Sequence, residues 1–149
     1  MTTLSAQVKP ERLREVDGRA LLALRWYERA QGIEVPEDRY VALWIALEAL
    51  AGGPGTDFLK RVWELIVAAL GGPAQAEVAR SRIDLRALRD LRNRIMVGAG
   101  REQAPTNVEF TVSAGTLRIL EALVEDTLRD RLSIARTQSL ANAISQRAS

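Results

Sequence analysis

Apolar side chains recur every three or four residues over most of the chain, and glycine or proline interrupts this spacing at intervals. Such a period places the apolar side chains on one face of an α-helix. The segments predicted as helices are about 10–31, 36–51, 57–70, 85–98 and 114–132, and apolar spacing extends beyond the last of them to about 144. Helices of this length joined by short loops predict an all-α bundle of four to five helices.

Residues at the predicted boundaries support this division. Pro10 and Pro36 suit the first turn of a helix, where the missing backbone N–H leaves no hydrogen bond unmade. Asp84 and Ser113 are typical N-cap residues, whose side chains accept a hydrogen bond from the first turn. Gly18 is a weak point inside the first predicted helix.

The polar stretch 98–114 separates the last two predicted helices. Its run Val108–Val112 is the only β-like pattern and is too short to found a sheet, so a loop or one edge hairpin is expected. Nothing in the sequence divides the chain, and residues 1–149 are expected to form one domain. The terminal segments 1–9 and 145–149 are expected to fray.

The 149 residues include no cysteine and no histidine, which excludes several classes of chemistry. Thiolate nucleophiles, Ser-His-Asp triads and zinc sites built on histidine or cysteine all need an absent residue. A metal could bind only to carboxylates, and we expect neither a metal site nor a cofactor. No apolar run approaches the roughly 20 residues of a membrane-spanning helix, and no signal sequence opens the chain. We therefore expect no membrane association and a cytoplasmic location.

Two charged residues fall on apolar faces of the predicted helices. With about 100° per residue, Arg92 lies about 40° from Leu88, inside the apolar stripe of its helix. Glu48 lies about 40° from Trp44 in the same way. Such charges are much less costly when they pair, so we predict that Glu48 and Arg92 meet. The pair would either fix the register of the two helices or orient Arg92 toward a phosphate.

Arginines gather on the polar side of the helix that carries Arg92. Residues 80–101 have a net charge of +5, whereas the rest of the chain sums to −3. Such a patch is either a footprint for a polyanion or a solvated helix face. The candidate RNA-binding residues are Arg86, Arg89, Arg94 and Arg101. The aromatic residues interpreted as core are Trp26, Tyr27, Trp44 and Trp63. Because no aromatic residue interleaves the arginines, the sequence argues against binding of single strands by base stacking.

Two segments resemble the HEPN family, particularly its Apea-like branch. They are 38–50, DRYVALWIALEAL, and 88–95, LRDLRNRI. The resemblance implies an all-α, commonly dimeric fold in a family with many metal-independent endoribonucleases and toxins of defence systems. The family signature is an arginine, a polar residue and then a histidine that four to six residues separate from the arginine. In the family, the arginine and histidine of two protomers gather over the scissile phosphate. Arg92 and Asn93 match the first two positions.

The histidine of this signature is absent, and Val97 stands at its expected position. Valine transfers no proton, and general acid–base catalysis contributes about 10²–10⁴-fold. The resemblance therefore implies an impaired ribonuclease with Arg92 and Asn93 as site residues. Glu48, which the helical projection adds to the candidate site, could act as a base only if Arg92 does not engage it. Three explanations stay open: a degenerate domain kept for RNA binding or assembly, a toxic nuclease inactivated by substitution, and a chance resemblance.

The resemblance also implies partners. A homodimer is expected, with the face bearing Arg92 and the loop 98–101 as the candidate interface. RNA and a nucleotidyltransferase-like antitoxin are the other candidate partners. The alternative function is a non-catalytic helical module that binds a protein, such as an antitoxin-partner domain. Salt-dependent RNA binding distinguishes the two functions, because phosphate contacts weaken steeply as salt rises.

Overall fold

The structure is a computed structural model that describes residues 3–53, 55, 57–99, 112–135 and 137–148, and the side chains of these except 12–13, 97–99 and 146–148. The α-helices are α1 (Pro10–Glu15), α2 (Gly18–Gln31), α3 (Pro36–Leu50), α4 (Phe58–Ala69), α5 (Ala76–Arg82), α6 (Leu85–Ala99), α7 (Ala114–Arg131) and α8 (Ser139–Ala148). Short 3₁₀ helices occur at η1 (Ser5–Gln7) and η2 (Pro73–Gln75). No strand occurs in the residues named above, which confirms the all-α class.

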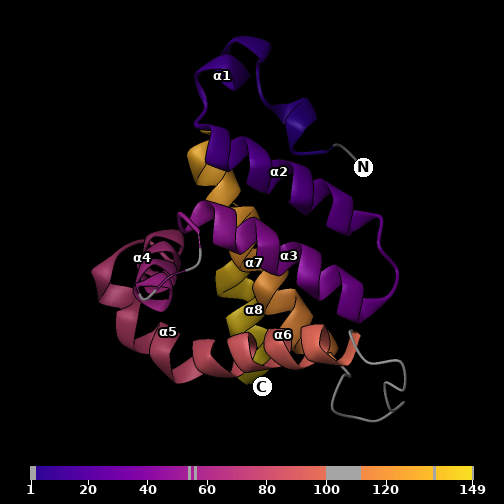
Figure 1. Cartoon of the computed structure of the whole chain (residues 1–149). Helices are drawn as coiled ribbons and strands as arrows, with labels where there is room; N and C mark the ends of the chain where they lie inside the picture. The colour runs from indigo at the N-terminus through magenta and orange to yellow at the C-terminus, as the bar shows by residue number, and fades with distance from the viewer. Residues whose placement is uncertain (1–2, 54, 56, 100–111, 136, 149) are drawn as a thin grey trace.

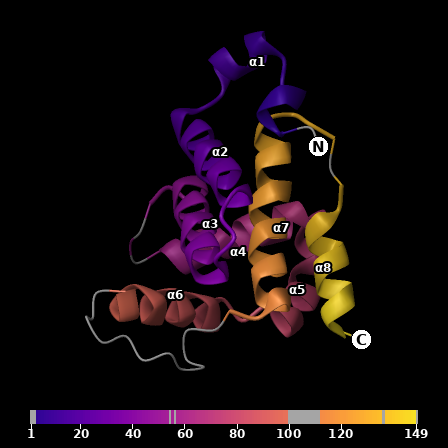
Figure 2. The same cartoon turned by 90° about the vertical axis from the view of Figure 1, so that its right-hand side faces the viewer.

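The long helices pack around α7, which lies at the centre of the bundle. α2 and α3 lie side by side and antiparallel, and α8 runs antiparallel along α7 (Figure 1 and Figure 2). α6 crosses one end of α3 at a steep angle to the other long helices (Figure 2). No helix among the described residues has both the length and the apolar character that crossing a membrane requires.

The core is apolar and joins all the long helices. Its largest fully buried side chains are Tyr40, Leu43, Leu47, Val62, Ile66, Ile119, Leu120, Leu123, Val124, Leu128, Leu132 and Leu140. The ring of Trp44 stacks on Tyr40 with centroids 6.3 Å apart and meets Phe58 at 5.6 Å. These contacts join α3 to α4 and confirm the prediction that Trp44 belongs to the core.

Several predicted boundaries are confirmed, and one predicted helix is divided. The backbone N–H of Ala87 donates to the Asp84 carboxylate at 3.0 Å, and that of Thr116 donates to the Ser113 hydroxyl at 3.1 Å. The predicted helix 10–31 is instead two helices, α1 and α2. Asp17 caps α2 by accepting from the backbone N–H of Arg19 at 2.9 Å. A capping residue beside Gly18 outweighs the continuous apolar spacing there.

The apolar spacing that continues to about residue 144 belongs to two helices, α7 and α8. α7 ends at Arg131, and the chain turns back to α8 through Ser133 and Gln138, which both adopt a positive φ of 56°. Apolar residues of both α7 and α8 are buried in the same core, so the apolar spacing in the sequence continues past the end of α7. Helix α8 extends to Ala148, where fraying was expected.

Two further segments differ from the prediction. Of the segment 1–9, which was expected to fray, the described residues 3–9 pack against the core through buried Leu4 and Val8. The short helix α5 was missed, because its seven residues are too few for a clear apolar period. The predicted β-like run lies outside the described residues except for Val112, which is buried.

Candidate functional site

The predicted meeting of Glu48 and Arg92 occurs in the structure. Arg92 Nη2 on α6 lies 3.6 Å from Glu48 Oε1 on α3. The pair is less buried than the apolar stripes suggested, with 33% of the Arg92 side chain and 21% of the Glu48 side chain exposed. On α6, Leu88 and Ile95 are buried, whereas the side chains of Glu48 and Arg92 are only partly buried.

Asn93 completes a cluster of three polar side chains. Arg92 Nη1 donates to Asn93 Oδ1 at 3.0 Å, so Arg92 lies between Asn93 and Glu48. A guanidinium has five N–H donors, and the described contacts engage one terminal nitrogen with each partner. The partly exposed Arg92 side chain can therefore still offer donors to an anion. An exposed ion pair of this kind contributes at most about 1 kcal/mol to stability.

Tyr40 fixes α6 at this site, a role that sequence reasoning missed. Its buried hydroxyl donates to the carbonyl oxygen of Leu88 at 2.6 Å. Burial raises the pKa of Tyr40 well above its ordinary value, and the nearby charge of Arg94 acts in the opposite direction. Tyr40 is therefore neutral at physiological pH and positions α6 without exchanging protons.

Tyr40→Phe is expected to lower the free energy of unfolding by about 1–2 kcal/mol, because it leaves the Leu88 carbonyl without this donor. Urea denaturation measures the change. The matched control is Tyr27→Phe, since Tyr27 is also a buried residue and its hydroxyl makes no hydrogen bond among the described residues. Equal losses in the two variants would show that the bond to Leu88 does not stabilise the fold.

The predicted RNA-binding arginines on α6 point to solvent where they are described. Arg86, Arg89 and Arg94 are all exposed. Arg101 lies outside the described residues, and for Val97 the structure gives only a backbone inside α6. Met96, which follows Arg92 by one helical turn, is 46% exposed.

A cleft opens where α4, α5 and the start of α6 meet. It has a volume of about 810 Å³, and Trp63, Arg80, Arg82 and Arg86 are among its lining residues. Trp63, which was interpreted as core, is partly buried and packs against the core while it also lines this cleft. An aromatic side chain from another helix thus lies in the same cleft as three of the arginines, although none interleaves them in the sequence. Sequence spacing could not reveal this, because Trp63 comes from α4 and the arginines from α5 and α6.

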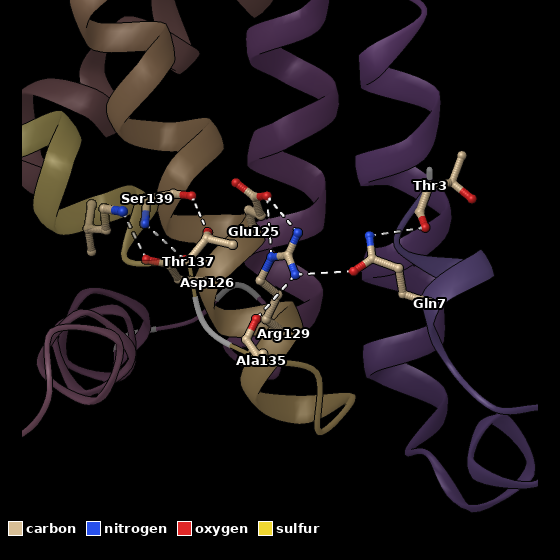
Figure 3. A network of polar contacts seen from close by, with 9 residues as sticks. Thr3, Gln7, Glu125, Asp126, Arg129, Ala135, Thr137 and Ser139 are labelled. Atoms are coloured by element: carbon tan, nitrogen blue, oxygen red, sulfur yellow. Dashed lines mark hydrogen bonds and ion pairs between the residues drawn. The ribbon is translucent and has the colours of Figure 1, made fainter. Parts of the chain in front are cut away.

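A second polar cluster, on α7, was also missed. Asp126 is 1% exposed, and its carboxylate accepts hydrogen bonds from the backbone N–H groups of Ser139 at 3.3 Å and Leu140 at 2.8 Å (Figure 3). Burial raises the pKa of Asp126, and these two hydrogen bonds oppose that shift. Asp126 thus holds the first turn of α8 against α7. Its position about 60° from Leu123 on α7 is a signal that the helical projection could have used.

Arg129 lies one turn further along α7. Its guanidinium contacts the carboxylate of Glu125 at 3.3 Å, the carbonyl oxygen of Ala135 at 3.2 Å and the side-chain oxygen of Gln7 at 3.4 Å (Figure 3). These partners belong to α7, to the connection before α8 and to η1. The cluster is structural, because its groups bind one another inside the fold.

Neither metal chemistry nor similarity to known proteins adds a functional assignment. Among the side chains that the structure describes, no three or more acidic groups are arranged to hold a metal ion. Comparisons with protein-family models, curated proteins and solved structures found no match. The function must therefore be argued from the site itself.

Proposed function

We propose that this chain is an RNA-binding helical domain of the HEPN type in which RNA cleavage is lost or strongly reduced. The observation that carries the proposal is the contact of Arg92 with both Glu48 and Asn93 at the exposed edge of α6. Arg92 and Asn93 match the family signature, and Glu48 comes from α3, which lies far from α6 in the sequence.

The chemistry of RNA cleavage explains why the site could bind RNA without cleaving it. Attack by the 2′-OH requires removal of its proton, delivery of a proton to the 5′-oxygen and cationic donors for the crowded phosphorane. Arg92 can supply the cationic donors. Glu48 is engaged by Arg92, and Val97 stands where the family places a histidine. The proposed site therefore binds a phosphate without an efficient means of proton transfer.

The exposed arginines of α6 supply the proposed contacts to the RNA backbone. Arg86, Arg89 and Arg94 carry three positive charges on the solvent side of this helix. Each contact with a phosphate releases counterions and makes the affinity depend on salt. The proposal includes a homodimer, because the family assembles its site from two protomers, and a sedimentation measurement tests that part.

Binding of a single-stranded RNA oligonucleotide is expected to weaken steeply as salt rises. For single strands the slope of log affinity against log salt is about −0.7 per phosphate contact. A triple variant with Arg86→Ala, Arg89→Ala and Arg94→Ala is therefore expected to reduce the magnitude of the slope by roughly two. Fluorescence anisotropy of a labelled oligonucleotide at several salt concentrations measures both quantities.

The matched control removes the same charge elsewhere. Arg14, Arg25 and Arg131 are exposed and lie on α1, α2 and α7. Their triple alanine variant is expected to keep most of the slope. Equal losses in the two triple variants would contradict a binding surface on α6. Absence of RNA binding by the folded wild type at low salt would favour the alternative of a protein-interaction module.

A further inference from the structure

The cleft between α4, α5 and α6 combines two kinds of surface. Leu59 and Trp63 of α4 are partly buried side chains in its lining, with buried Ile83 and Leu85 beside them. Exposed arginines form the other part, and they are Arg80, Arg82 and Arg86. Figure 1 shows how α5 leads from α4 round to the start of α6, which brings these residues together.

The positive charge of this cleft is largely uncompensated. In the part of the chain that the structure describes, no ion pair engages Arg80, Arg82 or Arg86. Asp84 is the only acidic residue in the lining, and its carboxylate accepts from the backbone N–H of Ala87. The charge of Asp84 offsets one of the three arginines and leaves the lining with two uncompensated positive charges.

The two surfaces together select the class of ligand. A simple anion would leave Trp63 and Leu59 unused, and an apolar molecule would leave three guanidinium groups without a partner. A nucleotide has a planar base that stacks on an indole ring and a phosphate that suits the planar fork of arginine. The volume of about 810 Å³ lies within the range of small-molecule sites, roughly 300–1,000 Å³.

We propose that this cleft binds a nucleotide unit, with the base against Trp63 and the phosphate among Arg80, Arg82 and Arg86. The unit can be a free nucleotide or one nucleotide of an RNA strand, since the two share this chemistry. The inference goes beyond the proposed function and does not require it. Glu48, Arg92 and Asn93 take no part in the cleft.

Calorimetric titration with adenosine 5′-monophosphate tests the inference, with adenosine, inorganic phosphate and a short RNA as parallel ligands. The monophosphate is expected to bind more tightly than adenosine or phosphate alone. Trp63→Leu and Arg82→Ala are each expected to weaken binding by about tenfold, from loss of stacking and of a charge-assisted hydrogen bond respectively. Arg25→Ala, which removes an exposed arginine of α2, is expected to leave the affinity unchanged.

The outcomes separate the parts of the inference. Binding of the short RNA but not of the free monophosphate, with the same sensitivity to Trp63→Leu, assigns the site to a nucleotide within a strand. Equal affinities for phosphate and monophosphate, or an equal effect of Arg25→Ala and Arg82→Ala, would overturn the proposal. So would absence of binding by every ligand. Arg82 and Arg80 are exposed, so their alanine variants test the site even if Trp63→Leu fails to fold.

Failure of this inference is distinguishable from failure of the proposed function. The variant Arg89→Ala lies outside the cleft and is expected to weaken RNA binding without changing the affinity for the monophosphate. A protein that binds RNA through α6 but does not bind the monophosphate, and whose RNA affinity Trp63→Leu leaves unchanged, contradicts only the inference about the cleft. A protein that binds the monophosphate but does not bind RNA contradicts only the function proposed for α6.

Discussion

Replacing Val97 with histidine is expected to raise metal-independent RNA cleavage by about 10²–10⁴-fold over the wild type, the usual contribution of general acid–base catalysis. Position 97 lies inside α6, beyond the Arg92 and Asn93 that match the family signature. In the proposed function these residues bind the phosphate, and the missing capacity is proton transfer. Cleavage of an end-labelled RNA oligonucleotide in the presence of a chelator measures the gain.

Two further variants make this prediction specific. Arg92→Ala in the Val97→His background is expected to remove the gain, because it removes the proposed phosphate donor. Met96→His places an imidazole one turn after Arg92 but outside the spacing of the family, and it is expected to give no comparable gain. A gain from Met96→His alone would contradict the alignment with the HEPN signature. No cleavage by a folded, dimeric Val97→His protein would count against a nuclease origin.

The largest loss of stability is expected from Asp126→Ala. Two backbone N–H groups at the start of α8 donate to this buried carboxylate, and alanine leaves both without their acceptor. Unsatisfied buried donors and a lost helix cap together lower the free energy of unfolding by roughly 2–4 kcal/mol. Urea denaturation measures the loss. Asp90→Ala, at an exposed position of α6, is the control and is expected to change stability by less than about 0.5 kcal/mol.

The raised pKa of Asp126 determines the direction in which the stability of the fold changes with pH. Burial raises the pKa of Asp126 in the folded protein above its unfolded value of about 3.9, so the folded state holds this proton more tightly. The contribution of this carboxyl to stability is therefore full below about pH 4 and is lost as pH rises through the raised pKa. Asp126→Asn removes the titration. The stability of the wild type relative to Asp126→Asn should decrease with pH across this window, and an increase would contradict the raised pKa.

The sequence predicted those features that depend on local spacing. Pro36 and Asp84 mark the starts of α3 and α6 because a proline and a capping side chain act within one helical turn. The contact between Glu48 and Arg92 was predictable because each charge falls close to an apolar stripe and each needs a partner. The HEPN arrangement itself remains an expectation of the resemblance.

Features that depend on packing between distant segments were not predictable in this way. The cleft exists because α5 turns the chain so that Arg82 comes beside Trp63, and the short α5 has too few residues for a clear pattern. Likewise, apolar spacing continues through the break between α7 and α8. The acceptor that holds the start of α8 is Asp126, which lies on α7, and its role is evident only when α8 folds back.

The contacts of Arg129 have a consequence for the two ends of the chain. One guanidinium holds both Gln7, in the segment before α1, and Ala135, in the connection that leads to α8. Detaching the first residues would thus remove one support of a side chain that also braces the last helix. The stability of the N-terminal segment and that of α8 are therefore linked, although some 130 residues of chain separate them. A tag or truncation at one terminus is expected to change the stability of the segment at the other.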